Sequence, residues 1–260
     1  MKVFFIRKKS PLWLLSAMSA AAFILISIFL CFTPGAVQTA YGNAASEEFI
    51  YKVSSLTSGE EKIAYLTFDD GPNAEITPKI LDILKAENVK ASFFVIGKAV
   101  EAHPEIVKRA YEEGHYIANH GYSHDNSVLY ESSESFKNEI EKTDSAIGEA
   151  IGIKGYRSHI FRFPNGYMSP LYKEKKKEAL PLLSKMNYAY IDWNCLNNDS
   201  MQKYTETQLL ENLKKSAQGK GTLVVLMHDT NDVSDSSVVL KASIAYLRAQ
   251  GYEFRNFYDC

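Results

Sequence analysis

The fold of this chain is decided by the stretch IAYLTFDDGP, residues 63–72. Residues 63–68 form a short and mostly apolar run, which is typical of a strand buried on both faces. Asp69 and Asp70 follow the run directly, and a Gly-Pro pair then favours a turn. At the end of a buried strand, successive side chains point in different directions. One carboxylate can therefore bind a metal while its neighbour faces a reacting group.

Downstream of this strand, strand-like and helix-like segments alternate to the end of the chain. We expect further strands at 91–96, 115–118, 159–161, 188–191, 222–227 and 252–254. We expect the intervening helices at 76–87, 104–114, 134–151, 173–186, 206–216 and 236–249. Such alternation predicts a parallel sheet with helices outside it. Six or seven units in about 200 residues favour one α/β domain, a distorted (β/α) barrel over 62–260.

The net charge of −2 is the sum of two unlike parts. Residues 1–46 carry four basic residues and no acid, whereas residues 47–260 hold the remaining 25 of 29 basic residues and all 31 acidic ones. This balance excludes a strongly basic nucleic-acid-binding protein, and the hydrophobic content of 46% excludes a disordered chain. The lysines of 173–177 sit among glutamates and predict a solvated helix face.

Residues 1–40 have the layout of a targeting segment. A basic head precedes an apolar stretch at 12–32, and small residues follow it. The stretch is long enough to cross a bilayer at about 20 residues per crossing, so a cleaved signal peptide and a retained membrane anchor both fit. In either case we expect the rest of the chain to be exported. Residues 41–61 are polar, small and aperiodic, and we expect a linker there.

The cysteines indicate no metal site of the zinc-finger type, because no CxxC or Cys/His cluster is present. Export permits a disulfide between Cys195 and Cys260, but two unpaired thiols are the simpler expectation.

Polar clusters follow the expected strands at the points where the strands end. In a (β/α) barrel, this edge of the sheet carries the chemistry. The clusters are Asp69-Asp70, Asn119-His120 with His124, Arg162 to Gly166, Asp192-Trp193 and His228-Asp229. His120 and His124 would share one face if that stretch were helical. Two histidines and one aspartate leave coordination positions open, as in catalytic zinc sites, and ligands without thiolate also suit other divalent metals.

Taken together, five motifs in this order resemble those of the polysaccharide deacetylase family, the NodB-homology or carbohydrate esterase 4 enzymes. They are TFDDGP (67–72), NHGYSH (119–124), FRFPNG (161–166), DW (192–193) and LMHD (226–229). The resemblance covers roughly residues 62–255. It implies a distorted (β/α) barrel and a metal-dependent hydrolase.

The resemblance also implies a role for each matching polar residue. Asp70, His120 and His124 would hold a divalent metal, with Zn²⁺ foremost and Co²⁺, Ni²⁺ or Mn²⁺ as alternatives. Asp69 would be the general base that activates water, and Arg162 would orient it.

On the leaving-group side, the resemblance implies that His228 is the general acid that protonates the departing amine. Asp192 would hold His228 and raise its pKa. A backbone N–H near Asn165 would stabilise the oxyanion, while Trp193 and Leu226 would line a slot for the acetyl methyl group. The family commonly has an aromatic residue or glycine where this chain has Asn165, so the sugar-facing surface differs there.

These observations predict an enzyme that removes N-acetyl groups from N-acetylglucosamine units of an extracellular polysaccharide. Peptidoglycan is the first expectation, because an exported protein meets the cell wall first. Chitin oligomers, an exopolysaccharide and acetyl xylan are alternatives within the same class. A carbohydrate-binding pseudoenzyme is the alternative of another class. We expect no nucleic-acid partner, and contact with the membrane through residues 1–40 if they are retained.

Overall fold

The computed structural model describes residues 45–230 and 233–260. The targeting segment predicted for residues 1–40 lies outside the described residues. Within the described ranges, no helix combines the length and apolarity needed to cross a membrane.

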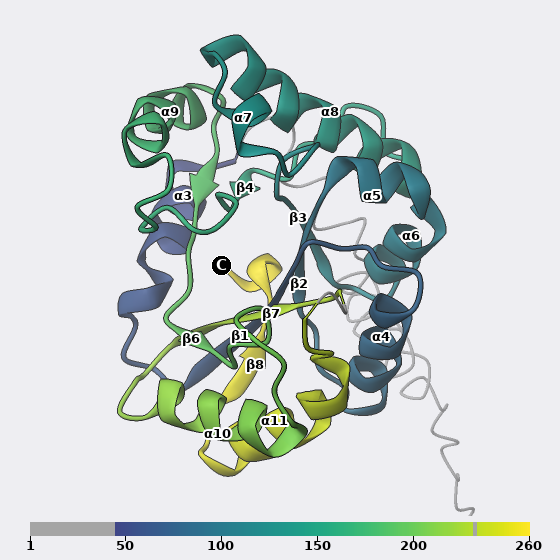
Figure 1. Cartoon of the computed structure of the whole chain (residues 1–260), viewed down its shortest axis with the longest axis vertical. Helices are drawn as coiled ribbons and strands as arrows, with labels where there is room; N and C mark the ends of the chain where they lie inside the picture. Colours follow the sequence, from purple (N-terminus) through teal and green to yellow (C-terminus); the bar gives the residue numbers. More distant parts are fainter. Residues whose placement is uncertain (1–44, 231–232) are drawn as a thin grey trace, which may run out of the picture. The chain divides into compact units, whose positions relative to one another are not determined.

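All strand pairings of the sheet are parallel, and β1 lies near its centre (Figure 1). The strand order is β5-β4-β3-β2-β1-β7-β6, and β8 pairs with the first half of β1. The strands are β1 (Ile63–Asp69), β2 (Ser92–Val95), β3 (Tyr116–Asn119), β4 (Ile160–Phe161), β5 (Ala189–Tyr190), β6 (Cys195–Leu196), β7 (Leu223–His228) and β8 (Glu253–Arg255). The predicted α/β fold, a distorted barrel of parallel strands, is confirmed.

The helices lie outside the sheet, as Figure 1 shows for α4, α10 and α11. They are α3 (Glu47–Ser55), α4 (Ile76–Ala86), α5 (Gly97–Ala102), α6 (Pro104–Glu112), α7 (Asn126–Leu129), α8 (Ser133–Ile151), α9 (Lys173–Lys185), α10 (Glu206–Ala217) and α11 (Ser237–Ala249), with short 3₁₀ turns at Leu56–Ser58 and Phe257–Asp259. Several begin at side-chain caps: Thr205 and Gln208 form a capping box at α10, and Ser132 caps α8.

Every residue of β1 is buried, and this explains why its sequence is a nearly continuous apolar run. The strand pairs with β7 on one side and with β2 and β8 on the other. The strand that carries the first polar motif is therefore held in the middle of the sheet, where its carboxyl end has little freedom to move.

The linker predicted for 41–61 is wrong for its described part. Residues 47–55 form α3, which is capped by Ser46 and packs Phe49 and Val53 into the core. The helix was missed because it is short and only two of its apolar side chains are fully buried. Cys195 and Cys260 are both unpaired, as expected.

Candidate active site

The two aspartates at the end of β1 diverge because the chain turns between them. Asp69 is the last residue of the strand, is 3% exposed and lies beside His228 in the parallel register with β7. Asp70 has a φ of 77°, in the left-handed region. The turn separates the directions of the two carboxylates, as the sequence predicted.

Gly71 is required by close packing under this turn. A Cβ at Gly71 would lie 2.0 Å from Oδ2 of Asp229, the buried residue that follows His228. Asp229 Oδ2 accepts a hydrogen bond from the Thr77 hydroxyl at 2.7 Å. Burial raises the pKa of Asp229 to about 7. The Asp-Asp-Gly-Pro turn thus packs against the end of β7.

His120 and His124 come together through a loop, and the helical arrangement considered for them is wrong. The chain after β3 is not helical until α7, and Gly121 and His124 have φ values of 87° and 54°. Glu139, on α8, holds this loop: its Oε2 accepts hydrogen bonds from Tyr122 N at 2.9 Å, from Ser123 N at 2.8 Å and from the Ser123 hydroxyl at 2.9 Å.

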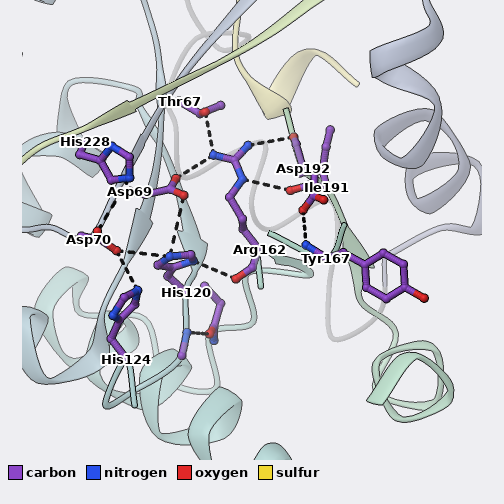
Figure 2. A network of polar contacts seen from close by, with 12 residues as sticks. Thr67, Asp69, Asp70, His120, His124, Arg162, Tyr167, Ile191, Asp192 and His228 are labelled. Carbon is purple, nitrogen blue, oxygen red and sulfur yellow. Dashed lines mark hydrogen bonds and ion pairs between the residues drawn. The ribbon is translucent and has the colours of Figure 1, made fainter. Parts of the chain in front are cut away.

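Asp70, His120 and His124 form a group whose ligand atoms lie within 4.8 Å of one another. Asp70 Oδ1 is 3.3 Å from His120 Nε2 and 3.2 Å from His124 Nε2 (Figure 2). His120 Nδ1 donates to the Arg162 carbonyl at 2.8 Å, so that its Nε2 is left to act as a ligand. Asp70 Oδ1 is buried and has no hydrogen-bond partner among the described residues. These features fit a divalent metal.

The charges in this group support the same assignment for Asp70 and His124. Burial would raise the pKa of Asp70, but the close imidazoles of His120, His124 and His228 outweigh it and hold the pKa well below the usual range. Burial, together with the charge of His120, lowers the pKa of His124, which favours the neutral imidazole that binds metals. The pKa of His120 is raised: burial opposes this change, but Asp69 and Asp70 outweigh it.

Arg162 is fully buried and joins both sides of the site. Its Nη1 donates to Asp69 Oδ1 at 2.7 Å and to the Thr67 hydroxyl at 2.8 Å. Thr67 and Asp69 are two apart on β1, so their side chains lie on the same face of the strand. One oxygen of Asp69 is thereby fixed, as expected for an oriented general base. Removing a buried partner of this kind costs about 3–5 kcal/mol.

Arg162 also binds the connection between the two edge strands β5 and β6. Strands β5 and β6 follow each other along the chain but do not pair. Arg162 Nε donates to the carbonyl of Ile191 at 3.0 Å and Nη2 to that of Asp192 at 3.2 Å, both in the segment between these strands. The guanidinium stacks on Phe94, 3.9 Å from the ring centroid. The residue that orients Asp69 therefore also ties the connection between β5 and β6 to β1.

His228 is held by Asp199, and the expectation that Asp192 holds it is wrong. His228 Nδ1 donates to Asp199 Oδ1 at 2.7 Å, and the His228 N–H donates to Asp199 Oδ2 at 2.8 Å. Burial alone would lower the pKa of His228, but the hydrogen bond and charge of Asp199 outweigh it and raise the pKa to about 9. His228 Nε2 lies 3.9 Å from Asp70 Oδ2.

The Asp192 carboxylate faces a different loop. Its Oδ1 accepts from Tyr167 N at 2.9 Å and its Oδ2 from Met168 N at 3.1 Å. Figure 2 shows Asp192 on the other side of Arg162 from His228. A position at a strand end predicts that a polar residue lies near the site. It does not predict which hydrogen-bond donors will bind that residue.

Asp199 and Glu139 are the two residues of the site that the sequence reasoning missed. Asp199 ends a polar run, Asn197-Asn198-Asp199, directly after β6, and the strand-end rule would have selected it. The strand β6 follows β5 with no helix between them, so the alternation of strands and helices does not predict it. Glu139 gives no such signal, because it lies within the long helix α8.

The residues expected to bind the acetyl group lie near the polar residues described above. They are Asn165, Trp193 and Leu226. Leu226 pairs with Thr67 in the β1–β7 register, and the Trp193 ring lies 5.7 Å from the Arg162 guanidinium carbon. Asn165 has a φ of 63° and its Oδ1 accepts from Asn126 Nδ2 at 2.9 Å. Within residues 45–230 and 233–260, the Asn165 N–H has no acceptor, so it is free to donate to a ligand.

Of Tyr122, Tyr130 and Tyr167, the last two are used in packing. Tyr130 is buried and stacks on Tyr172, and the ring of Tyr167 packs between Phe163 and Tyr190. Tyr122 is half-buried and its hydroxyl donates to Glu101 at 3.0 Å.

Comparisons with known proteins find relatives of one kind. Residues 57–190 match the polysaccharide deacetylase family. A peptidoglycan-N-acetylglucosamine deacetylase of Bacillus cereus is 36% identical over 73% of this chain and 64% of its own length. The peptidoglycan-N-acetylmuramic acid deacetylase PdaA of Bacillus subtilis is 30% identical over 80% of this chain and 75% of its own length.

A similar fold has been solved in the same group of proteins. The catalytic domain of the peptidoglycan N-acetylglucosamine deacetylase from Eubacterium rectale has a TM-score of 0.69 and 30% identity, and the match covers 75% of this chain and 88% of that domain. The chain spans between 36% and 66% of the length of several other curated relatives.

Proposed function

Because this chain belongs to the polysaccharide deacetylase family, we propose that it is a metal-dependent hydrolase that removes N-acetyl groups from N-acetylglucosamine units of an extracellular polysaccharide. The observation that carries the proposal is the arrangement around Asp70, His120 and His124. An oriented carboxylate, Asp69, and a charged imidazole, His228, flank this candidate metal site. Amide hydrolysis needs a base for water and an acid for the amine, and the site offers both.

A divalent ion held by Asp70, His120 and His124 would supply Lewis-acid chemistry at the acetyl carbonyl and would make water acidic. Asp69 takes the proton of the attacking water. Its Oδ1 is tied to Arg162, whereas its Oδ2 lies 3.8 Å from His120 Nε2 and faces the candidate metal site. Arg162 keeps the carboxylate from rotating as the water O–H bond breaks.

His228 provides the proton for the leaving amine. Asp199 fixes Nδ1 as a donor, so Nε2 is the nitrogen that points toward the reacting groups. A pKa of about 9 keeps the imidazole charged at neutral pH. When the C–N bond breaks, the proton passes from Nε2 to the nitrogen and the sugar leaves as a neutral amine.

The remaining residues bind the acetyl group. The free N–H of Asn165 supports an oxyanion, since preorganised backbone donors stabilise charge that develops in the transition state. Leu226 and Trp193 offer apolar surface beside Thr67 and Arg162 for the methyl group.

Peptidoglycan is the proposed substrate. Relatives named for peptidoglycan deacetylation match most of this chain, and the basic and apolar residues 1–40 support export to where the wall lies. PdaA is named for N-acetylmuramic acid, so that sugar is the second candidate within the same polymer. Zn²⁺ is the proposed metal, with Co²⁺, Ni²⁺ and Mn²⁺ as alternatives that suit nitrogen and oxygen ligands.

The test is acetate release by the full chain, before and after chelation and after Zn²⁺ is returned. Peptidoglycan, chitin oligomers and acetyl xylan are compared side by side, and the deacetylated sugar of peptidoglycan is identified by mass. We expect release from peptidoglycan that chelation abolishes and Zn²⁺ restores. A protein that binds glycan and metal but releases no acetate is the pseudoenzyme.

Three variants separate the roles of the residues. Asp70→Ala should lose the metal, because one of three ligands is gone. Asp69→Ala and His228→Ala should keep it and lose about 10²–10⁴-fold in kcat, the typical contribution of a positioned base or acid. Metal content is measured beside activity. Loss of metal in Asp69→Ala would mean that the two aspartates have exchanged roles.

A further inference from the structure

Lys176 is buried, although the sequence predicts that the lysines of 173–177 lie on a solvated helix face. Its neighbours Lys175 and Lys177 are exposed and pair with Glu178 and Glu174. Lys176 is only 1% exposed, although it lies on the same helix, α9. A buried ammonium costs free energy unless hydrogen bonds replace its water. The contacts that replace this water therefore indicate what the side chain does.

Both partners of Lys176 are carbonyls of the loop that follows β4. Nζ donates to the Gly166 carbonyl at 2.5 Å and lies 3.5 Å from that of Ser169. Asp192 binds the same loop with the opposite charge, through the N–H groups of Tyr167 and Met168. We call the pair Lys176 and Asp192 the loop clamp.

The loop clamp acts on a single peptide group from both ends. The carbonyl of Gly166 and the N–H of Tyr167 belong to the same peptide unit, and they face the ammonium and a carboxylate oxygen. A peptide dipole between two opposite charges has one preferred orientation. The unit therefore resists rotation more strongly than it would with neutral partners.

The held peptide follows the turn of residues 163–166, which the Gly166 N–H closes by donating to the Phe163 carbonyl at 2.7 Å. Asn165 and Gly166 have φ values of 63° and 77°, and two successive left-handed residues are costly where one has a side chain. A Cβ at Gly166 would lie 2.8 Å from the ring of Trp193, so the turn also passes close to that side chain. Asn165 carries the free N–H that the proposed function uses.

We propose that Lys176 and Asp192 are positioning residues for hydrolysis: by fixing the Gly166–Tyr167 peptide, they hold the Asn165 N–H where the oxyanion forms. The effect on hydrolysis rests on the proposed function. The fixing of the Gly166–Tyr167 peptide does not depend on it. If the loop clamp is correct, its loss slows the chemical step, because a donor displaced by about 1 Å costs up to about 100-fold in rate. Binding of the ground state changes little.

The experiment compares Asp192→Asn, Lys176→Met and Lys176→Arg with a control, Lys177→Met, on the exposed face of α9. All are made in the full chain and loaded with Zn²⁺. Thermal unfolding and metal content are recorded first, so that rates refer to folded, loaded protein. Steady-state rates are measured on the peptidoglycan substrate, and amide hydrogen exchange is measured over residues 165–169.

We expect Asp192→Asn and Lys176→Met to lower kcat by about 10-fold to 100-fold with KM changed less than about threefold. We expect Lys176→Arg to recover part of this loss and Lys177→Met to show none. Amides of Tyr167 and Met168 should exchange at least about tenfold faster in the two clamp variants. A rate defect that lies in KM alone, or no defect in folded protein, overturns the proposal.

The exchange measurement keeps this test separate from that of the proposed function. If the unaltered chain releases no acetate from any glycan, the deacetylase proposal fails, and exchange alone decides the loop clamp. Unchanged exchange at Tyr167 and Met168 in both clamp variants overturns the clamp whatever the activity is.

Discussion

Two aspartates flank the short strand β6 in the sequence, and they accept hydrogen bonds from different donors. Asp192 precedes the strand and accepts hydrogen bonds from two backbone N–H groups of the 166–169 loop. Asp199 follows it and accepts from the imidazole and the N–H of His228. Both residues follow strands at the same edge of the sheet, and either would satisfy a rule based on sequence position.

The difference teaches that a carboxylate has no fixed role at this edge. An ionised carboxylate can only accept hydrogen bonds, so its effect depends on which donors surround it. Beside an imidazole it raises a pKa, and beside backbone N–H groups it fixes a loop. The order of the strands decides which of these donors is near: β6 pairs with β7, which ends at His228, whereas β5 pairs with β4, which leads into the loop.

Asp199→Asn should have the largest effect of the changes that test this comparison. The amide still accepts from Nδ1, but it cannot stabilise the charged imidazole. We expect kcat at neutral pH to fall by about 10²–10⁴-fold, as when the carboxylate partner of a catalytic histidine is neutralised. The measurement is acetate release by zinc-loaded protein.

The pH dependence of the rate tests the role of Asp199 directly. His228 acts in its charged form, and its pKa is raised to about 9, so the rate should fall as pH rises through about 9. In Asp199→Asn, burial remains and the carboxylate is gone. The pKa then drops toward or below about 6.5, and the descending limb moves to lower pH. An unmoved limb would contradict the assignment of Asp199.

Asp192→Asn should have a smaller effect of a different kind. We expect the descending limb to stay near pH 9, because Asp199 still holds His228, while kcat falls by about tenfold or more through the loop. The pH profiles of Asp192→Asn and Asp199→Asn are recorded on the same substrate. A limb that moves as far in Asp192→Asn as in Asp199→Asn would restore the pairing first expected for Asp192.

Ser236→Ala should have the smallest effect. The Ser236 hydroxyl donates to Asp199 Oδ2 and accepts from Asn197 Nδ2 at 2.8 Å, so it supports Asp199 without touching His228. We expect the free energy of unfolding to fall by about 1–2 kcal/mol and kcat by less than about tenfold. Denaturant unfolding and acetate release measure the two effects, and the exposed Ser145→Ala serves as the control. A loss as large as that in Asp199→Asn would give Ser236 a direct role.

Much of the fold and the candidate metal site could be predicted from the sequence. The apolar run that forms β1 is buried along its whole length, and Asp70, His120 and His124 meet at the carboxyl edge of the sheet. Both predictions succeed for one physical reason. Strand ends of a parallel sheet converge at one edge, so residues that are far apart in sequence but follow strands come together.

The failures have physical reasons of their own. The helix α3 was missed because it buries only Phe49 and Val53, which is too weak a pattern to predict a helix. The strand β6 was missed because no helix separates it from β5, and Asp199 was missed with it. Lys176 was placed on a solvated face because its neighbours are charged, although its own side chain turns inward to the 166–169 loop.

By itself, the sequence determined that a buried strand ends in Asp69 and Asp70 and that the candidate metal-binding and acid–base residues follow parallel strands. Only the tertiary structure decided their partners. Arg162 binds Asp69 across 93 residues, Asp199 binds His228 across 29, and Asp192 binds Tyr167 across 25. Local chemistry selects which side chains can carry charge or donate a hydrogen bond. The packing order of strands and loops selects which of them come within about 3 Å of one another, the distance at which hydrogen bonds form.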